Sequence, residues 1–281
     1  MDVDDAGSAT GPGERGLTPE AAVAQVRVRV PTRGNRRLEG LLEKVNADLE
    51  LRTWWHMAQV ASERLGMSDH SWVHVQIVLN IALRLLRLLA RAGIEPATVN
   101  DHGLGRRDAE IVVAAGALLH DVGMSIHRAD HEEYSLFLAE RKLRELLEDA
   151  YAEPERTVVI SEALHSIIGH RRRGEPYTLE AGVVRVADAL DMAHGRSRVP
   201  VEAGRVGIHS LSAAAIDEIS IDAGEERAVR VEIKMNNSAG IFQVDDLLAT
   251  KLRGTPLEGH VEVVATIEGE TEKRLLSEFR L

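Results

Sequence analysis

The sequence has no cysteine among its 281 residues. This absence excludes disulfides, thiolate nucleophiles, and zinc or iron–sulfur sites held by cysteine. Any metal site in this chain must therefore use histidine nitrogens and carboxylate oxygens, and the 12 histidines make such a site possible.

Long apolar runs and a surplus of basic residues are also missing. No run of about 18 consecutive apolar residues is present, and the acidic, glycine-rich N-terminus is unlike a secretory signal. We therefore predict a soluble, cytoplasmic protein with no membrane partner. The net charge of −11 argues against a broad basic surface for duplex DNA. Small anionic ligands and short single-stranded RNA remain possible partners, and the sequence leaves a homo-oligomer open.

Changes in residue pattern divide the chain into parts. The content of 44% apolar residues is sufficient for a hydrophobic core. Residues 1–22 are small and polar and predict a disordered tail, whereas the alternating valines of "QVRVRVP" predict a strand within 23–36. We expect a helical domain over 37–204 and a small α+β domain over 205–281.

Apolar residues at spacings of three and four predict the helices of the larger domain. The clearest stripe includes Ile77, Ile81, Leu85 and Leu88. Breaks at glycine and proline separate the predicted helices. These helices are expected over 38–65 (one or two helices), 71–92, 107–120, 131–150, 155–170 and 179–194.

The period changes to two after Pro200. "AVRVEIKM", "HVEVVATIE" and "KRLLSEFRL" read as strands, and "IFQVDDLLATKL" between the first two has a helical pattern. The fold class predicted is mainly α, with a helical bundle and a small C-terminal α+β domain, which the strand at 25–30 could join.

Four potential metal ligands belong to apolar helices. The run from Ile111 to Leu119 ends in His120 and Asp121, His74 lies on the stripe of an earlier helix, and Asp188 lies within a late one. An ionised carboxylate in a core needs a cation or a tight hydrogen-bond network. One or two divalent ions (Mn, Fe, Ni, Zn or Mg) would satisfy these groups.

The order His74, then "HD" at 120 and 121, then Asp188 resembles the signature of the HD-domain superfamily of metal-dependent phosphohydrolases. The resemblance covers roughly residues 70–195 and implies an all-helical fold in which these four residues bind a metal. The superfamily includes nucleotidases, cyclic-nucleotide phosphodiesterases, RNases and a minority of di-iron oxygenases.

Members with two metals carry further histidines between the HD pair and the last aspartate. His131, His165 and His170 are the candidates here, with solvent-facing histidines as the alternative. His165 and His170 are about 140° apart around a helix, so one of them could contact the substrate instead.

The resemblance also implies a mechanism in which a metal supplies both an activated water and a Lewis acid. Asp121 would bridge two ions, and His127, His131 or His170 could protonate the leaving group. Asp191 competes with Asp188 as the ligand of its helix. The candidates are catalytic Asp121, His131 and His170; metal-binding His74, His120, Asp121, His131, His165, His170 and Asp188; and substrate-binding His127, Asp191, Arg196 and Arg198.

Two departures from the family pattern narrow the prediction. Met124 occupies the position at which many members have lysine, and the GYP extension of cyclic-di-GMP phosphodiesterases is missing. We therefore expect a phosphodiesterase or nucleotidase acting on a nucleotide or short RNA. A catalytically silent nucleotide-binding regulator and a di-iron oxygenase are the alternatives. The exact substrate, the identity of the metal and the role of the C-terminal domain are left open.

Overall fold

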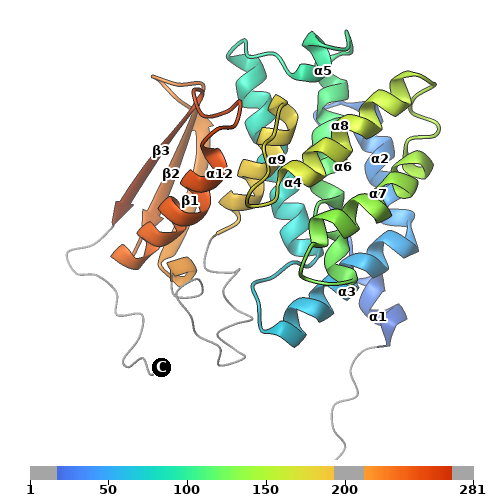
Figure 1. Cartoon of the computed structure of the whole chain (residues 1–281), viewed down its shortest axis with the longest axis horizontal. Helices are drawn as coiled ribbons and strands as arrows, with labels where there is room; N and C mark the ends of the chain where they lie inside the picture. Colours follow the sequence, from blue (N-terminus) through green and yellow to red (C-terminus); the bar gives the residue numbers. More distant parts are fainter. Residues whose placement is uncertain (1–17, 193–211, 268–281) are drawn as a thin grey trace, which may run out of the picture.

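The computed structural model describes residues 18–192 and 212–267, and helices make up most of this part of the chain (Figure 1). The predicted mainly α fold with a small α+β part is confirmed. The helices of the first part are α1 (Pro19–Ala24), α2 (Arg36–Ala47), α3 (Leu49–Leu65), α4 (Trp72–Arg91), α5 (Ala97–Asn100), α6 (Arg106–Leu119), η1 (Val122–Ser125), α7 (His131–Leu146), α8 (Glu155–Gly169) and α9 (Leu179–Leu190).

Capping residues set several helix boundaries. The side chain of Asp48 accepts a hydrogen bond from Leu51 N, so the predicted helix at 38–65 is divided here into α2 and α3. Gly66 ends α3 with φ of 61°, a left-handed conformation that glycine adopts without strain. Ser71 and Thr178 cap α4 and α9 in the same way as Asp48 caps α3.

Helix α6 forms the centre of the bundle, in contact with α4, α8 and α9. Every residue of α6 from Ile111 to Leu119 is buried. Gly116 allows the close approach of α8, because a Cβ at this position would lie 2.8 Å from Ser166 Cβ. The most apolar segment of the sequence is therefore the central helix of the core, and its C-terminal end lies inside the protein.

Helix α4 is long and apolar enough to cross a membrane by length and composition, with a mean hydropathy of 1.6. The prediction that no run of about 18 consecutive apolar residues exists still holds, because polar residues such as Gln76, Asn80 and Arg84 interrupt this helix. The helix nevertheless packs against α3, α6, α9 and the sheet, and its buried residues include His74. These contacts identify α4 as a core helix and support the prediction of a soluble protein.

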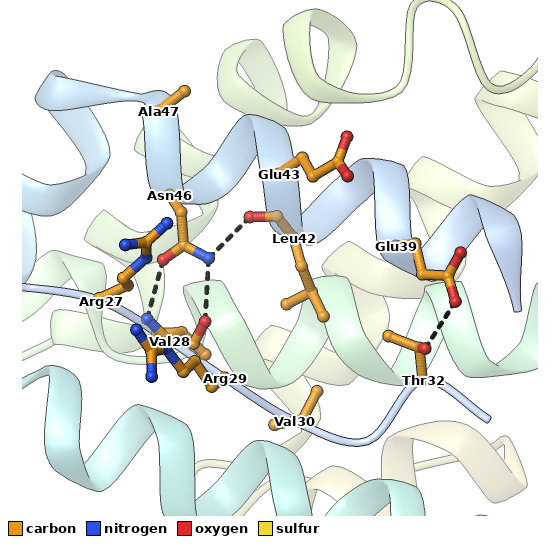
Figure 2. A pocket seen from close by; sticks show the side chains of 10 residues that line it. All are labelled: Arg27, Val28, Arg29, Val30, Thr32, Glu39, Leu42, Glu43, Asn46 and Ala47. Atoms are coloured by element: carbon orange, nitrogen blue, oxygen red, sulfur yellow. Dashed lines mark hydrogen bonds between the residues drawn. The ribbon is translucent and has the colours of Figure 1, made fainter. Parts of the chain in front are cut away.

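The segment predicted as an N-terminal strand is extended but pairs with no strand among residues 18–192 and 212–267. Asn46 of α2 takes the place of a neighbouring strand: its Oδ1 accepts from Val28 N (2.8 Å) and its Nδ2 donates to Val28 O (2.9 Å; Figure 2). Val26 and Val28 are buried, so the predicted alternation of buried and exposed residues is confirmed. The segment nevertheless lies on the helices and does not join the sheet. Residues 19–22, predicted to be part of a tail, belong to α1.

The second part of the described chain contains a three-stranded sheet of order β1 (Ile216–Ala223), β2 (Val229–Met235) and β3 (Val261–Ile267). Strands β1 and β2 are antiparallel, and β2 and β3 are parallel. The predicted β2 and β3 are confirmed, whereas β1 was not predicted. A register shift between Ile216 and Glu218 breaks the alternation in β1 and hides it in the sequence. The strand predicted at 273–281 lies outside the described residues.

A crossover connects the two parallel strands, as parallel pairing requires. It contains η3 (Ser238–Gly240), η4 (Gln243–Ala249), which has π-helical hydrogen bonds, and α12 (Thr250–Leu252). In Figure 1 the sheet lies beside the bundle, and α12 lies between the sheet and α9. The predicted domain boundary at 204 and 205 falls outside the described residues.

Candidate metal centre

His120 and Asp121 follow the last residue of α6, and the helix carries both side chains into the interior. His120 is fully buried and Asp121 is 3% exposed. The carbonyl of Ala117 accepts a hydrogen bond from His120 Nδ1 (2.8 Å). This bond fixes the imidazole ring so that its Nε2 faces the centre of the site.

Three ligand atoms converge on one side of Asp121. His74 Nε2 lies 3.2 Å from His120 Nε2, and each of these nitrogens lies 3.3 Å from Asp121 Oδ2. Because Nδ1 of each ring donates elsewhere, a neutral ring presents a lone pair at Nε2. Two lone pairs and a carboxylate oxygen at such distances repel one another unless a cation lies among them. These residues therefore fit a bound metal ion.

Asp191 holds His74 in place. Its Oδ2 lies 2.5 Å from His74 Nδ1 and accepts the ring proton. Such carboxylates fix the tautomer and orientation of a metal-binding histidine. Asp191 is 7% exposed and faces His74, so this contact supports a role in positioning His74 rather than the predicted contact with the substrate.

A second group of ligands lies on the other side of Asp121. Asp121 Oδ1 is 3.1 Å from His131 Nε2 and 3.6 Å from His170 Nε2. All three residues are buried, and each group's ligand atoms lie within 4.8 Å of one another. Since Oδ2 faces the first group and Oδ1 the second, Asp121 has the position of a bridging carboxylate.

Protonation of the two histidines in the second group differs. Burial, with the nearby His120 and Lys251, lowers the pKa of His170 to about 3. Its Nδ1 donates to Ile167 O (2.5 Å), so its Nε2 has a lone pair available for a metal. Burial alone would lower the pKa of His131, but hydrogen bonds to Asp121 and Glu132 raise it to about 9. A divalent ion in the second group would replace the Nε2 proton of His131.

Asp121 itself stays ionised. Burial alone would raise the pKa of this carboxyl, but when no metal is bound the positive charge of a protonated His120 and hydrogen bonds from His120, His131 and His74 hold it well below its usual range. An anion at the centre of both groups increases their attraction for divalent cations.

Gly123 allows the second group to form. A Cβ at Gly123 would lie 2.0 Å from His131 O and 2.6 Å from Ser135 N. Gly123 N donates to Ser135 Oγ (2.9 Å), and this hydroxyl donates to His120 O (2.7 Å). The start of α7 is thereby held against the end of α6, which brings His131 to Asp121.

Asp188 of α9 lies at the edge of the first group. Its Oδ1 is 3.4 Å from His74 Nε2 and 4.0 Å from His120 Nε2. Its Oδ2 forms an ion pair with Lys251 Nζ of α12. The predicted ligand is therefore in place to bind an ion through Oδ1 while Lys251 occupies the other oxygen.

The structure does not bring His165 to either group. The ring of His165 stacks on Tyr177 at a centroid distance of 4.9 Å, and its Nε2 accepts from Tyr177 N (2.9 Å). Its predicted metal-binding role is wrong because these contacts direct the ring away from Asp121. His127 is exposed and forms local hydrogen bonds with Ala129, which do not support a substrate-binding role. Arg196 and Arg198 lie outside the described residues.

Three residues near the site were not found from the sequence. Lys251 lies on the crossover, and His70 is buried with its ring 5.6 Å from that of His74. The Arg185 guanidinium donates to backbone carbonyls on both sides of the site, including Gly169 O (3.0 Å) and Lys251 O (2.9 Å). An arginine inside the apolar helix α9 was the available signal, because a buried guanidinium requires several acceptors.

Comparison with known proteins agrees with this geometry. Residues 69–193 match the HD domain family, and that range contains both ligand groups. The chain is 36% identical over 238 residues to the "Uncharacterized protein MJ1020" of Methanocaldococcus jannaschii, a match that covers 83% of this chain and 92% of the relative. The chain belongs to the HD-domain family. No solved structure matches it significantly.

Membership in the HD-domain family places the chain in a superfamily of metal-dependent phosphohydrolases. HD domains typically bind divalent metals, and the two ligand groups of this chain are suited to that role. Met124 is fully buried in η1, so η1 offers no basic side chain at the position where many HD-domain proteins have lysine.

Proposed function

We propose that this HD-domain protein is a phosphodiesterase or nucleotidase that hydrolyses a nucleotide or short RNA with two divalent ions. The observation that carries the proposal is the position of Asp121, with one oxygen facing each ligand group. Bound divalent ions would lower the pKa of a water molecule and polarise a phosphoryl oxygen.

The residues of the chain orient and shield the site. Asp191 fixes the ring of His74, and backbone carbonyls fix those of His120 and His170. Buried surroundings exclude bulk water, which strengthens the interaction between fixed charges and a phosphoryl group. In this arrangement the Nε2 atoms of His131 and His170 face Asp121, which favours metal binding over the predicted proton donation to the leaving group.

The net charge supports the proposed substrate class, and the absence of cysteine supports the proposed metals. A net charge of −11 disfavours extended nucleic-acid surfaces and leaves compact phosphate esters and short single strands. The absence of cysteine requires ligands of nitrogen and oxygen, and manganese, iron, nickel, zinc and magnesium all accept these. A cytoplasmic location and a possible homo-oligomer belong to the same proposal.

The proposal is tested by metal analysis together with hydrolysis of an aryl phosphodiester and an aryl phosphomonoester. Protein purified without added metal should contain up to two divalent ions per chain and lose turnover with a chelator. Preference for the diester indicates a phosphodiesterase, and preference for the monoester a nucleotidase. Asp121→Ala should abolish turnover with the fold retained, and hydrolysis as fast as the parent would contradict the proposal.

A matched pair of histidine substitutions separates the second ligand group from other histidines. His131→Ala should lose one ion and reduce turnover by more than the roughly 10- to 100-fold typical of residues that merely support a ligand. His165→Ala, outside both groups, should keep both ions and turnover. Oxygen consumption by the iron-loaded protein without phosphate-ester hydrolysis would instead identify a di-iron oxygenase. Tight nucleotide binding without turnover would identify a silent regulator.

A further inference from the structure

Lys251 brings a positive charge to the site from outside the HD-domain match, which ends at residue 193. Its side chain is 15% exposed and forms an ion pair with Asp188 Oδ2. The other oxygen of Asp188 is 3.4 Å from His74 Nε2. The ammonium therefore lies one carboxylate away from the first ligand group, at the edge of the buried site.

Several contacts fix the backbone of Lys251. Arg185 Nε donates to Lys251 O (2.9 Å), and the same guanidinium donates to Gly169 O and Arg172 O, both at 3.0 Å. These two carbonyls flank His170 in the sequence. One buried guanidinium thus holds the backbone of Lys251 and the backbone around His170 in a fixed relation.

Close packing of the segment after α12 against α9 also limits movement. A Cβ at Gly182 would lie 2.7 Å from Leu257 Cδ1, so α9 and the segment at 255–257 are in direct contact. On the outer side, Arg172 forms an ion pair with Asp246 of η4 (3.0 Å). Contacts of the segments before and after α12 therefore fix the position of Lys251.

The charges of the site explain why a cation is needed at this edge. Asp121, Asp188 and Asp191 are all buried there, and an anionic phosphoryl group that approaches them is repelled unless positive charges face it. An ammonium has three N–H donors. In the part of the chain that the structure describes, Asp188 is the carboxylate that pairs with Lys251. One ammonium can therefore contact both Asp188 and a phosphoryl oxygen.

We propose that Lys251 binds a phosphoryl oxygen of the substrate, so that a residue of the α+β part completes the site of the HD domain. This inference rests on the proposed function, because it assumes a phosphate-bearing ligand at the metal centre. It gives the C-terminal part of the chain a direct role in substrate recognition.

The test uses the full-length, manganese-loaded protein and inorganic phosphate as the probe. Lys251→Met should bind phosphate about 10- to 100-fold more weakly, as expected for loss of a hydrogen bond to a charged group, with two ions per chain retained. Lys251→Arg should restore most of the affinity. Lys234→Met, a lysine on β2 paired with Glu218 (3.0 Å), is the matched control and should behave as the parent.

Titration calorimetry and elemental analysis read out these variants. A phosphate affinity of Lys251→Met within twofold of the parent would overturn the inference. Loss of metal together with phosphate binding would also overturn it, because Lys251 would then act only through Asp188. A second measurement does not depend on how the variants fold: phosphate should slow acetylation of Lys251 in the parent protein, while Lys234 reacts at an unchanged rate. A rate at Lys251 that phosphate does not alter would contradict the proposal.

The two proposals can fail separately. A parent protein that binds phosphate through Lys251 but hydrolyses no phosphate ester would refute the proposed function and keep this inference. Hydrolysis by the parent with an unchanged KM and phosphate affinity in Lys251→Met would keep the function and refute the role of Lys251.

Discussion

The helical part of the chain contains two clusters of ionisable residues, one around Lys142 and one around Asp121. The two clusters balance the charge of their carboxylates in different ways. Lys142 is 3% exposed, and its Nζ lies 2.7–2.8 Å from carboxylate oxygens of Asp48, Glu50 and Glu145. In the metal centre, Asp121 instead faces the Nε2 atoms of four histidines and no lysine or arginine among the described residues. The first cluster is built around its own lysine, whereas the histidines and carboxylate of the second are suited to a divalent ion from outside.

Exposure distinguishes these clusters further. The carboxylates around Lys142 have side chains that are 18%, 45% and 47% exposed, so water stabilises them as well. The side chain of Asp121 is 4% exposed. A carboxylate buried to that degree with histidine nitrogens around it indicates a metal site, whereas partly exposed carboxylates around a lysine indicate a structural ion cluster.

Asp191→Asn should give the largest effect among the tests of this comparison. The variant keeps the shape of the side chain but removes the negative charge that holds the His74 proton. Metal affinity or turnover should fall by roughly 10- to 100-fold, as for other residues that support metal-binding histidines. Titration of the metal-free protein with Mn²⁺ measures the change, and Asp149→Asn, which is exposed and paired with Lys44, should leave it unaffected.

Gly123→Ala tests whether the metal centre depends on a close backbone approach that the Lys142 cluster does not need. The added methyl group would clash with His131 O and should reduce the free energy of unfolding by roughly 1–3 kcal/mol. It should also separate His131 from Asp121 and reduce the metal content. Gly40→Ala is the control: a Cβ meets nothing within 4 Å at this position of α2, so this variant should be slightly more stable. Equal stability of the two variants would contradict the close approach.

Lys142→Met should have the smallest effect and leave metal content and turnover unchanged. Because its partners are partly exposed, the expected loss of stability is about 1 kcal/mol, and Lys44→Met on the surface should lose less. The hydrogen bond from Lys142, opposed by desolvation and helped by Arg141, lowers the pKa of Glu50.

This lowered pKa gives the sign of the pH dependence. A carboxyl whose pKa is lower in the folded protein stabilises the fold above its ordinary pKa of 4.5, and this contribution is lost as the pH falls through the lowered value. The difference in stability between the parent and Lys142→Met should therefore shrink in acid. Thermal unfolding at several pH values measures this difference, and one that grows below pH 4.5 would show that the cluster is not stabilising.

Much of the metal centre could be predicted because its ligands follow local patterns. His120 and Asp121 end the most apolar helix, His74 lies on a buried stripe, and His131 begins a helix after a short turn. Each of these residues lies within the single HD-domain segment. The order of residue types along the chain was therefore sufficient to group them.

The remaining features depend on contacts that no local pattern encodes. The choice between His165 and His170 depended on which face of α8 meets Asp121, and the stacking of His165 on Tyr177 decided it. The extended segment at Val28 has the alternation of a strand, but the side chain of Asn46 forms the hydrogen bonds to Val28 N and O that a neighbouring strand would otherwise form. Lys251 is 63 residues from Asp188 in sequence, and it lies beside Asp188 because the crossover packs on α9.

The parallel pairing of β2 and β3 restricts where the chain can accept insertions and deletions. Insertions in the turn at 224–228, between two antiparallel strands, would alter a surface loop and leave Lys251 where it is. The crossover at 236–260 connects the ends of β2 and β3, so an insertion or deletion between β2 and Lys251 should shift Lys251 relative to Asp188. We expect relatives that keep Lys251 to vary in length at the first connection and to conserve the length of the second.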